Sequence, residues 1–296
     1  MPHALRGIAW LLAAELLYVV MRLGTRANAG LLPWPLLAAT RFFGGALIVA
    51  SVAGWRGASL RVQDRRGTWM RSLFGAGSAV GVFYALGTDR IAVGDAATLS
   101  ATAPFFVAML SRPLLGEAVT RWVALAIAIG FAGAAILVSP SFHSAAPVAA
   151  IALAGAASYA MAMIWLRRVG PNESSEAVAL HVSLVSGTIL GLIGVVALAS
   201  GTVTLSGRPP QWGALAAAAV AGGLGQIAVT RAFALERAAT LGAVSYAGVA
   251  LTYLAEAVVL GHRPGPAQLG GAALIVAAGV LTVMRGRAPV VVDGES

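Results

Sequence analysis

The chain has 296 residues, of which 59% are hydrophobic and only 10% are charged, and its mean hydropathy is +0.85. A soluble domain of this length needs far more charge to cover its surface, so the composition predicts a polytopic helical membrane protein. The net charge of +9 comes from arginines that are spread between apolar segments rather than clustered on one polar domain, which argues against binding to nucleic acid.

Ten segments are apolar over about the twenty residues that a helix needs to cross a bilayer. They span residues 5–22, 34–55, 69–88, 93–112, 120–138, 146–167, 176–200, 211–231, 239–261 and 266–284. The breaks between them carry glycine, proline or charge, and none is long enough for a soluble domain. The first segment resembles a signal peptide, but it contains Glu15 and has no convincing cleavage site, so we expect a retained helix.

Arginine is unevenly distributed over the two ends of these segments, and this orients the bundle by the positive-inside rule. When the N-terminus is placed in the cytoplasm, most arginines, Arg71 among them, fall on the inner side. The outer side keeps Arg22, Arg26, Arg90, Arg208 and Arg263, while Arg41 falls within the second segment. We therefore predict a multi-pass protein of a bacterial inner membrane with both termini in the cytoplasm.

Glu15 lies within the apolar run of the first segment, where a charged side chain is costly unless it faces a cavity or a partner. Tyr18 and Arg22 follow at i+3 and i+7, so the three residues share one stripe of the helix. We predict that Glu15 and Tyr18 line a central cavity. The alternative is a side-chain network between Glu15 and Arg22, and a narrower hypothesis makes Glu15 a proton-coupling carboxylate.

Arg41 in the second segment and Glu256 in the ninth carry opposite charges at the same depth, each about 10 Å below the outer surface at 1.5 Å per residue. An ion pair between these two helices is therefore predicted. It would either brace the bundle or bind the ammonium and carboxylate groups of a substrate and open during transport. The remaining alternative is that each side chain reaches water separately.

Backbone features predict where the helices pack closely and where they bend. Gly77 and Gly81, like Gly187 and Gly191, are four residues apart, which allows the close approach of neighbouring helices. Pro104 lies about midway along segment 93–112 and removes one backbone hydrogen bond, so a kink is predicted there that would serve as a hinge.

Further candidates for the lining of the cavity combine a polar atom or a polarisable side chain with a position deep in a segment. They are Tyr84, Tyr159, Met163, His181, Gln226, Tyr246 and Tyr253. For the tyrosines and Met163, packing between helices is the alternative to substrate contact. For His181 the alternatives are hydrogen-bonded packing and a proton relay, and for Gln226 a tie between helices and contact with a zwitterion.

The two halves of the chain resemble each other. LLGE at 114–117 aligns with VLGH at 259–262, and Gly77 aligns with Gly222. Each half holds five crossings, and because five is odd, two tandem copies lie upside down relative to each other in the membrane. Inverted repeats are typical of secondary transporters, with the substrate near the midplane. We thus predict an all-α bundle of ten transmembrane helices, with one five-helix repeat in residues 1–143 and its inverted copy in 144–296.

The sequence also resembles a known family. The resemblance is carried by WPLLAATRFFGGALIV, by PFFVAMLSRPLLGEAVT with AIGFAGAAILV, and by SYAGVALTYLAEAVVLGHRPGPAQLGGAALIVAAGVLTV. These stretches are similar to the two EamA repeats of the drug/metabolite transporter superfamily, and most similar to its YddG-like amino-acid exporters. The resemblance covers nearly the whole chain and implies a bundle whose central cavity exports amino acids or related metabolites. The sequence departs from the family at His262, where the second repeat usually has a glutamate.

The leading hypothesis is a secondary exporter of amino acids or related small metabolites that works by alternating access, as a monomer in the bilayer and without a cofactor. The chain has no lysine, so it has no P-loop, and transport is either coupled to protons through Glu15 or Glu256 or facilitated. An exporter of other metabolites or drugs is the alternative, although few arginines remain in the cavity to hold the diphosphate of a nucleotide sugar. An intramembrane enzyme is disfavoured, because the chain has no cysteine and lacks the HExxH and GxSG strings.

Overall fold

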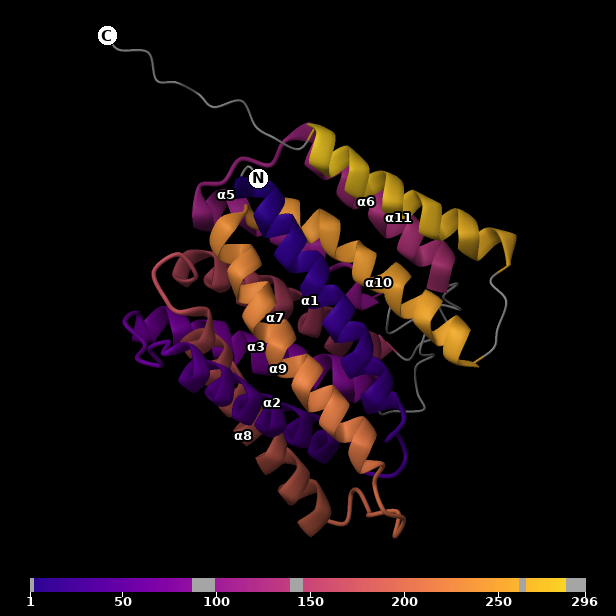
Figure 1. Ribbon diagram of the computed structural model, residues 1–296. Helices are drawn as coiled ribbons and strands as arrows, with labels where there is room; N and C mark the ends of the chain where they lie inside the picture. The colour runs from indigo at the N-terminus through magenta and orange to yellow at the C-terminus, as the bar shows by residue number, and fades with distance from the viewer. Residues whose placement is uncertain (1–2, 87–98, 139–145, 261–264, 286–296) are drawn as a thin grey trace.

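The computed structural model describes residues 3–86, 99–138, 146–260 and 265–285, and this part of the chain folds into ten helices (Figure 1). They are α1 (His3–Arg26), α2 (Trp34–Arg56), α3 (Arg65–Leu86), α5 (Ala103–Leu115), α6 (Arg121–Val138), α7 (Ala146–Val169), α8 (Ser175–Ala199), α9 (Trp212–Leu235), α10 (Ala238–Leu260) and α11 (Pro266–Arg285). The all-α class predicted from the sequence is confirmed.

Seven of the described helices are long and apolar enough to cross a membrane, namely α1, α2 and α7 to α11. Helices α5 and α6 are apolar but shorter over the described residues. The outer surface of the bundle carries large apolar side chains such as Leu47, Leu192 and Val276, which are 71%, 61% and 63% exposed. A lipid environment suits such a surface, whereas water does not.

The helices pack in a pattern that stays the same when the two halves are exchanged. In this exchange α1 corresponds to α7, α3 to α9 and α5 to α10. The contact between α1 and α9 then corresponds to the contact between α7 and α3, and the contact between α1 and α10 corresponds to that between α7 and α5. Helices α2 and α8 pack against each other, and so do α6 and α11, which lie side by side at the edge of the bundle (Figure 1). This is the pattern of two equivalent five-helix units, as expected for a duplicated chain. The boundary predicted between residues 143 and 144 lies outside the described residues and stays a prediction.

Glycines set the distance between several of these helices. Lipid gives apolar side chains little reason to associate, so membrane helices gain most from close packing. A Cβ atom added to Gly81 of α3 would lie 2.7 Å from the Cα atom of Gly155 on α7, so the two backbones touch. On α8, Gly187 and Gly191 instead receive the ring of Phe43 from α2. The close approach predicted from the glycine spacing is confirmed between α3 and α7, whereas between α8 and α2 the glycines make room for an aromatic side chain.

Where residues 99–112 are described, the structure differs from the continuous helix predicted over residues 93–112. Helix α5 begins only at Ala103, after a turn at residues 101–102, and Pro104 stands in its first turn. Proline is tolerated there because its missing N–H would have no partner within the helix. The Tyr246 hydroxyl donates a hydrogen bond of 2.9 Å to the Ala101 carbonyl, which satisfies an acceptor at this turn. Pro104 therefore starts a helix instead of bending one at its middle, and its role as a hinge stays a prediction.

The contact between α3 and α7 can be tested by adding one methyl group. We expect Gly81→Ala to lower the free energy of unfolding by about 1–3 kcal/mol, because the new Cβ meets backbone atoms that cannot move aside. Unfolding by SDS in mixed micelles would measure this loss.

Gly279→Ala on α11 is the matched control. Nothing lies within 4 Å of a Cβ atom at Gly279, and alanine favours the helix by about 1 kcal/mol, so stability should be unchanged or higher. Equal losses for the two variants would contradict a special role of the α3–α7 contact.

Candidate functional site

Glu15 is buried between α1 and α10, where it is 5% exposed. Its Oε2 lies 3.6 Å from Nη2 of Arg22, which lies about two turns further along α1. Arg22 also reaches α10, since its Nη1 donates to the Thr252 hydroxyl at 2.6 Å and to the Gly248 carbonyl at 3.3 Å. A side chain at position 248 would collide with the Glu15 carboxylate, so the glycine makes room for it. The Glu15–Arg22 network, one of the two alternatives from the sequence, is therefore present.

Arg41 and Tyr18 both face α9. Arg41 is 8% exposed, and its Cζ lies 4.1 Å from the ring centroid of the neighbouring Phe42, within the range of a cation–π interaction. Its Nε points towards Gly222 and has no hydrogen-bond partner among the described residues. The ring of Tyr18 packs against Gly225, which lies one turn further along α9.

Arg71 is the site residue that the sequence did not reveal. It is 3% exposed and lies within α3, nearly two turns after the start of that helix at Arg65. Its Nη2 donates to Oε1 of Gln226 at 3.3 Å, whereas its Nε has no partner in the described part of the chain. Arg71 is thus buried between helices, and its assignment to the cytoplasmic side of the membrane stays a prediction. Its position inside the apolar segment 69–88 is the signal in the sequence for this burial.

Two of the predicted residues hold helices together. The Nδ1 of His181 on α8 lies 2.8 Å from the Ser72 hydroxyl on α3, and its ring stands edge-on to Trp69. Tyr84 stands edge-on to Trp34 and packs against α7. These contacts favour packing, and a role in substrate binding stays a prediction. Among the residues that the structure describes, no three His, Asp or Glu side chains are placed to hold a metal ion.

The predicted residues of α10 do not form one group with Arg41. Tyr246 is 2% exposed and packs with Tyr253 against α6 and α11, on the far side of α10 from the charged cluster. Helix α2, which carries Arg41, packs mainly against α8 and α9. Glu256 lies on α10, but its side chain is outside the described residues, so its predicted ion pair with Arg41 stays a prediction.

A small cavity lies at the centre of the bundle, between α1, α5, α7, α9 and α10. It is lined by Leu11, Pro104, Val107, Tyr159, Met163, Phe233, Leu241, Gly242 and Ser245. Three predicted residues, Pro104, Tyr159 and Met163, thus meet at one place. The cavity volume is about 10 Å³, which is about the space of one water molecule. Sites for small molecules usually have several hundred Å³, so the bundle is closed around its centre.

The glutamate of the LLGE motif closes the end of the bundle that the arginine distribution predicts to be cytoplasmic. Glu117 lies just after α5 and accepts from Nε of Arg167 on α7 at 2.7 Å and from the Ala238 N–H at the start of α10 at 3.0 Å. Arg167 in turn donates to the Phe233 and Ala234 carbonyls at the end of α9, both at 3.1 Å. We call Glu117 and Arg167 the inner ion pair, because together they join the ends of four helices. His262, at the equivalent place in the second half, lies outside the described residues.

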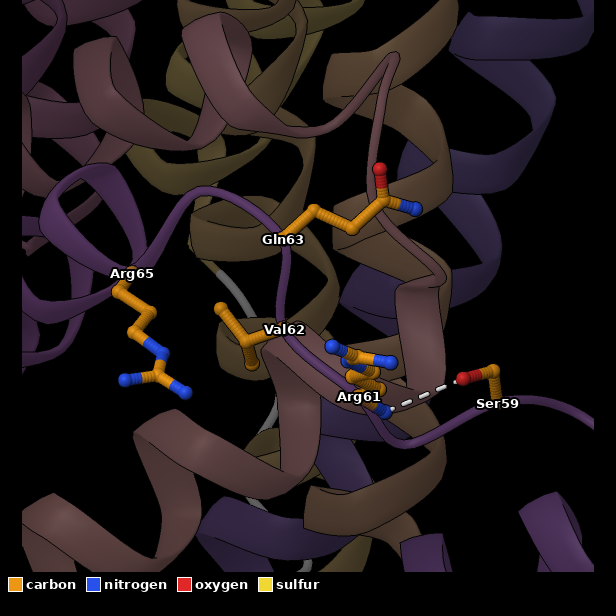
Figure 2. Close-up of a pocket in the computed structure, with 5 residues that line it drawn as sticks. All are labelled: Ser59, Arg61, Val62, Gln63 and Arg65. Carbon is orange, nitrogen blue, oxygen red and sulfur yellow. Dashed lines mark hydrogen bonds between the residues drawn. The ribbon is translucent and has the colours of Figure 1, made fainter.

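A larger hollow of about 460 Å³ lies in the loop between α2 and α3. Figure 2 shows its lining of Ser59, Arg61, Val62, Gln63 and Arg65. This loop is fixed to the loop before α8, because the Glu173 carboxylate accepts from the N–H groups of Gln63 and Asp64. The hollow is formed by one surface loop at the end of the bundle, so it does not continue the buried cluster.

Comparison with known proteins gives a family and several relatives. The sequence matches the EamA-like transporter family over residues 5–139 and again over residues 147–284. It is 25% identical to the pseudopaline exporter CntI of Pseudomonas aeruginosa over 273 residues, which are 92% of this chain and 94% of that protein. It is also 22% identical to a probable transport protein of Saccharomyces cerevisiae, over 72% of this chain and 66% of the relative.

The fold itself has a counterpart among solved structures. One crystal structure, titled only as that of a protein, superposes with a TM-score of 0.81 over 96% of this chain and 97% of the other, at 21% sequence identity. At this identity the likeness concerns the fold alone.

The Glu15–Arg22 network can be tested with a double-mutant cycle. We expect the losses of stability from Glu15→Gln and Arg22→Gln to be non-additive, with a coupling energy of about 0.5–3 kcal/mol, because the two side chains share a partly buried charge interaction. SDS unfolding of the two single variants and the double variant measures the coupling. If the two losses of stability add to within about 0.5 kcal/mol, the proposed network is contradicted.

A second cycle with Arg41→Ala and Glu256→Gln addresses the predicted ion pair between α2 and α10. Coupling between these two substitutions, in stability or in transport, would support the ion pair. Independent effects of the two substitutions on stability and on transport would contradict it.

Proposed function

This chain belongs to the EamA-like transporter family, and on that premise we propose that it exports amino acids or related small metabolites by alternating access. As a member of this family it is a multi-pass membrane transporter and not an enzyme. A relative that aligns over nearly its whole length is named as an exporter, which supports outward transport of a metabolite. Amino-acid export itself is supported by the resemblance of the sequence to the amino-acid exporters of this superfamily.

The observation that carries this proposal is a set of buried charges around a closed centre. Glu15, Arg41 and Arg71 are kept away from lipid between helices of both halves, as the substrate site of an inverted-repeat transporter would be. The central cavity holds only about one water molecule, so a substrate reaches this region only if the halves move apart. In this conformation the protein is closed at its centre, and transport needs at least one opening to each side.

Opening towards the cytoplasm would break the inner ion pair. Glu117 and Arg167 join the ends of α5, α7, α9 and α10, and helices from both halves thus meet in one cluster of charge-assisted hydrogen bonds. Such bonds contribute roughly 1.5–3 kcal/mol each, which is strong enough to favour the closed end and weak enough to break in a transport cycle.

The proposed mechanism uses no ATP and no cofactor. Export is driven by the gradient of the substrate or by protons. Glu15 is the group placed to bind a proton, because protonation of its carboxylate would weaken the ion pair with Arg22 and change the charge of the central cluster. We place the protein in the inner membrane of a bacterium, with both termini in the cytoplasm, and expect it to work as a monomer. Export of other metabolites or drugs is the second candidate, favoured by the relative that exports pseudopaline.

Transport by the purified protein in liposomes is the direct test. We expect labelled amino acids to cross the membrane faster than in protein-free liposomes. A pH gradient should accelerate transport if protons are coupled, and Glu15→Gln should abolish this acceleration while leaving downhill exchange. A screen in which no amino acid is transported would reject the amino-acid assignment.

The role of the inner ion pair can be tested by accessibility, because the natural chain has no cysteine to interfere. Ser245→Cys places a thiol in the lining of the central cavity. Adding Glu117→Gln should raise its labelling rate by a maleimide applied from the cytoplasmic side about tenfold, since the loss of about 1.4 kcal/mol from the closed state has that effect.

Glu236→Gln is the control for this experiment. Glu236 lies at the same end of the bundle, but among the described residues its side chain accepts a hydrogen bond only from the N–H of the adjacent Arg237. It should leave the labelling rate unchanged, and an equal increase in both variants would contradict the proposed role of Glu117.

A further inference from the structure

We propose that the central site takes an organic anion with two carboxylate groups, held by the guanidinium groups of Arg41 and Arg71. This inference rests on the proposed transport function and names the class of substrate within it. It depends on three features of the described residues: the burial of both arginines, their unpaired nitrogen atoms, and their common orientation towards one face of α9.

Both arginines are buried without a counter-charge among the described side chains. Arg41 and Arg71 are 8% and 3% exposed, and the Nε atom of each has no hydrogen-bond partner. Arg41 lies over the ring of Phe42, and Arg71 has the neutral amide of Gln226 at 3.3 Å. A buried guanidinium that lacks an anion costs several kcal/mol, so each arginine offers a strong and unused anion-binding group.

The one described carboxylate in the cluster already has a counter-charge, although its Oε2 accepts no hydrogen bond from the described residues. Glu15 lies 3.6 Å from Arg22, which ties both residues to α10. Arg41 and Arg71 stand on α2 and α3, and neither helix packs extensively against α10 over the described residues. Glu15 therefore balances Arg22 and leaves the positive charges of Arg41 and Arg71 without a counter-charge among the described side chains.

The two guanidinium groups converge on a short stretch of α9. Arg41 faces Gly222, and Arg71 binds Gln226, so their contacts are four residues and about 6 Å apart along the helix. The ring of Tyr18 packs on Gly225, which lies between Gly222 and Gln226 along α9. A molecule with two carboxylates separated by a few carbon atoms would meet both guanidinium groups and could accept a hydrogen bond from Tyr18.

The charge of this site discriminates between kinds of substrate. A cation would be repelled, and a simple zwitterion would bring an ammonium group for which no free described carboxylate remains. A dicarboxylate neutralises both arginines and satisfies their Nε–H groups. An acidic amino acid carries the same two carboxylate groups and agrees with amino-acid export, and its net negative charge distinguishes it from a simple zwitterion.

Thermal unfolding of the full-length protein in detergent tests the proposal with two probes of similar shape that differ in charge. At constant ionic strength, glutarate should raise the melting temperature by about 2–4 °C at ten times its dissociation constant, whereas its diamide should not. The series from malonate to adipate locates the best chain length. No stabilisation by any member of the series would overturn the proposal.

Variants assign the effect to the two arginines. Arg41→Gln and Arg71→Gln should each weaken glutarate binding at least tenfold, and Arg71→Lys, which keeps the charge, should weaken it less. Arg66→Gln removes an exposed arginine near the start of α3 and should leave binding unchanged. Equal glutarate binding by Arg71→Gln and by the parent protein would overturn the proposal. If Arg71→Gln does not fold, the binding of glutarate by Arg71→Lys and the dicarboxylate series on the parent protein test the proposal in its place.

Failure of this inference and failure of the proposed function give different results. Transport of neutral amino acids that dicarboxylates do not inhibit would support export and reject the anion site. Binding of glutarate that depends on Arg71, without transport of any amino acid, would support the site and reject amino-acid export. Inhibition of labelled glutamate transport by glutarate, but not by glutamine, would support both.

Discussion

The structure depends on keeping a few charged side chains out of lipid. A charge at this depth is tolerated only between helices, so Glu15, Arg22, Arg41 and Arg71 fix which faces of α1, α2 and α3 point inwards. The apolar remainder of these helices can face either lipid or protein and gives no such direction. Ion pairs and unpaired guanidinium groups are therefore what orients an otherwise featureless apolar bundle.

Close packing follows from the same constraint. Helices that gain little from burying apolar surface in lipid must touch along their backbones, and Gly81 against Gly155 achieves this for α3 and α7. On α9 the glycines have a second role, because Gly222 and Gly225 leave space that the side chains of Arg41 and Tyr18 occupy. The small residues thus allow both the contact between the halves and the burial of polar groups there.

The sequence is sufficient for the all-α class, the repeat and the family, because these rest on long apolar runs and recurring motifs. It located Glu15 and Arg41 from their charge alone, but it did not show which way a helix faces, since an apolar helix has no polar side to mark its orientation. Arg71 was missed for this reason, and Tyr246 was expected at the cavity although it packs towards α6. The turn before Pro104 depends on a tertiary hydrogen bond from Tyr246, which no local pattern contains.

The two halves share their scaffold but not their chemistry. Glu15, Arg41 and Arg71 all come from the first half, while the second half supplies the neutral face of α9 on which the arginines lie, including Gly222 and Gln226. An inverted repeat makes the opening of one end structurally equivalent to the opening of the other. A set of charges drawn from one half breaks that equivalence at the centre, and in the proposed site the same guanidinium groups would meet a substrate from whichever side it enters. Specificity can therefore reside in a few side chains of one repeat, while the motion belongs to both.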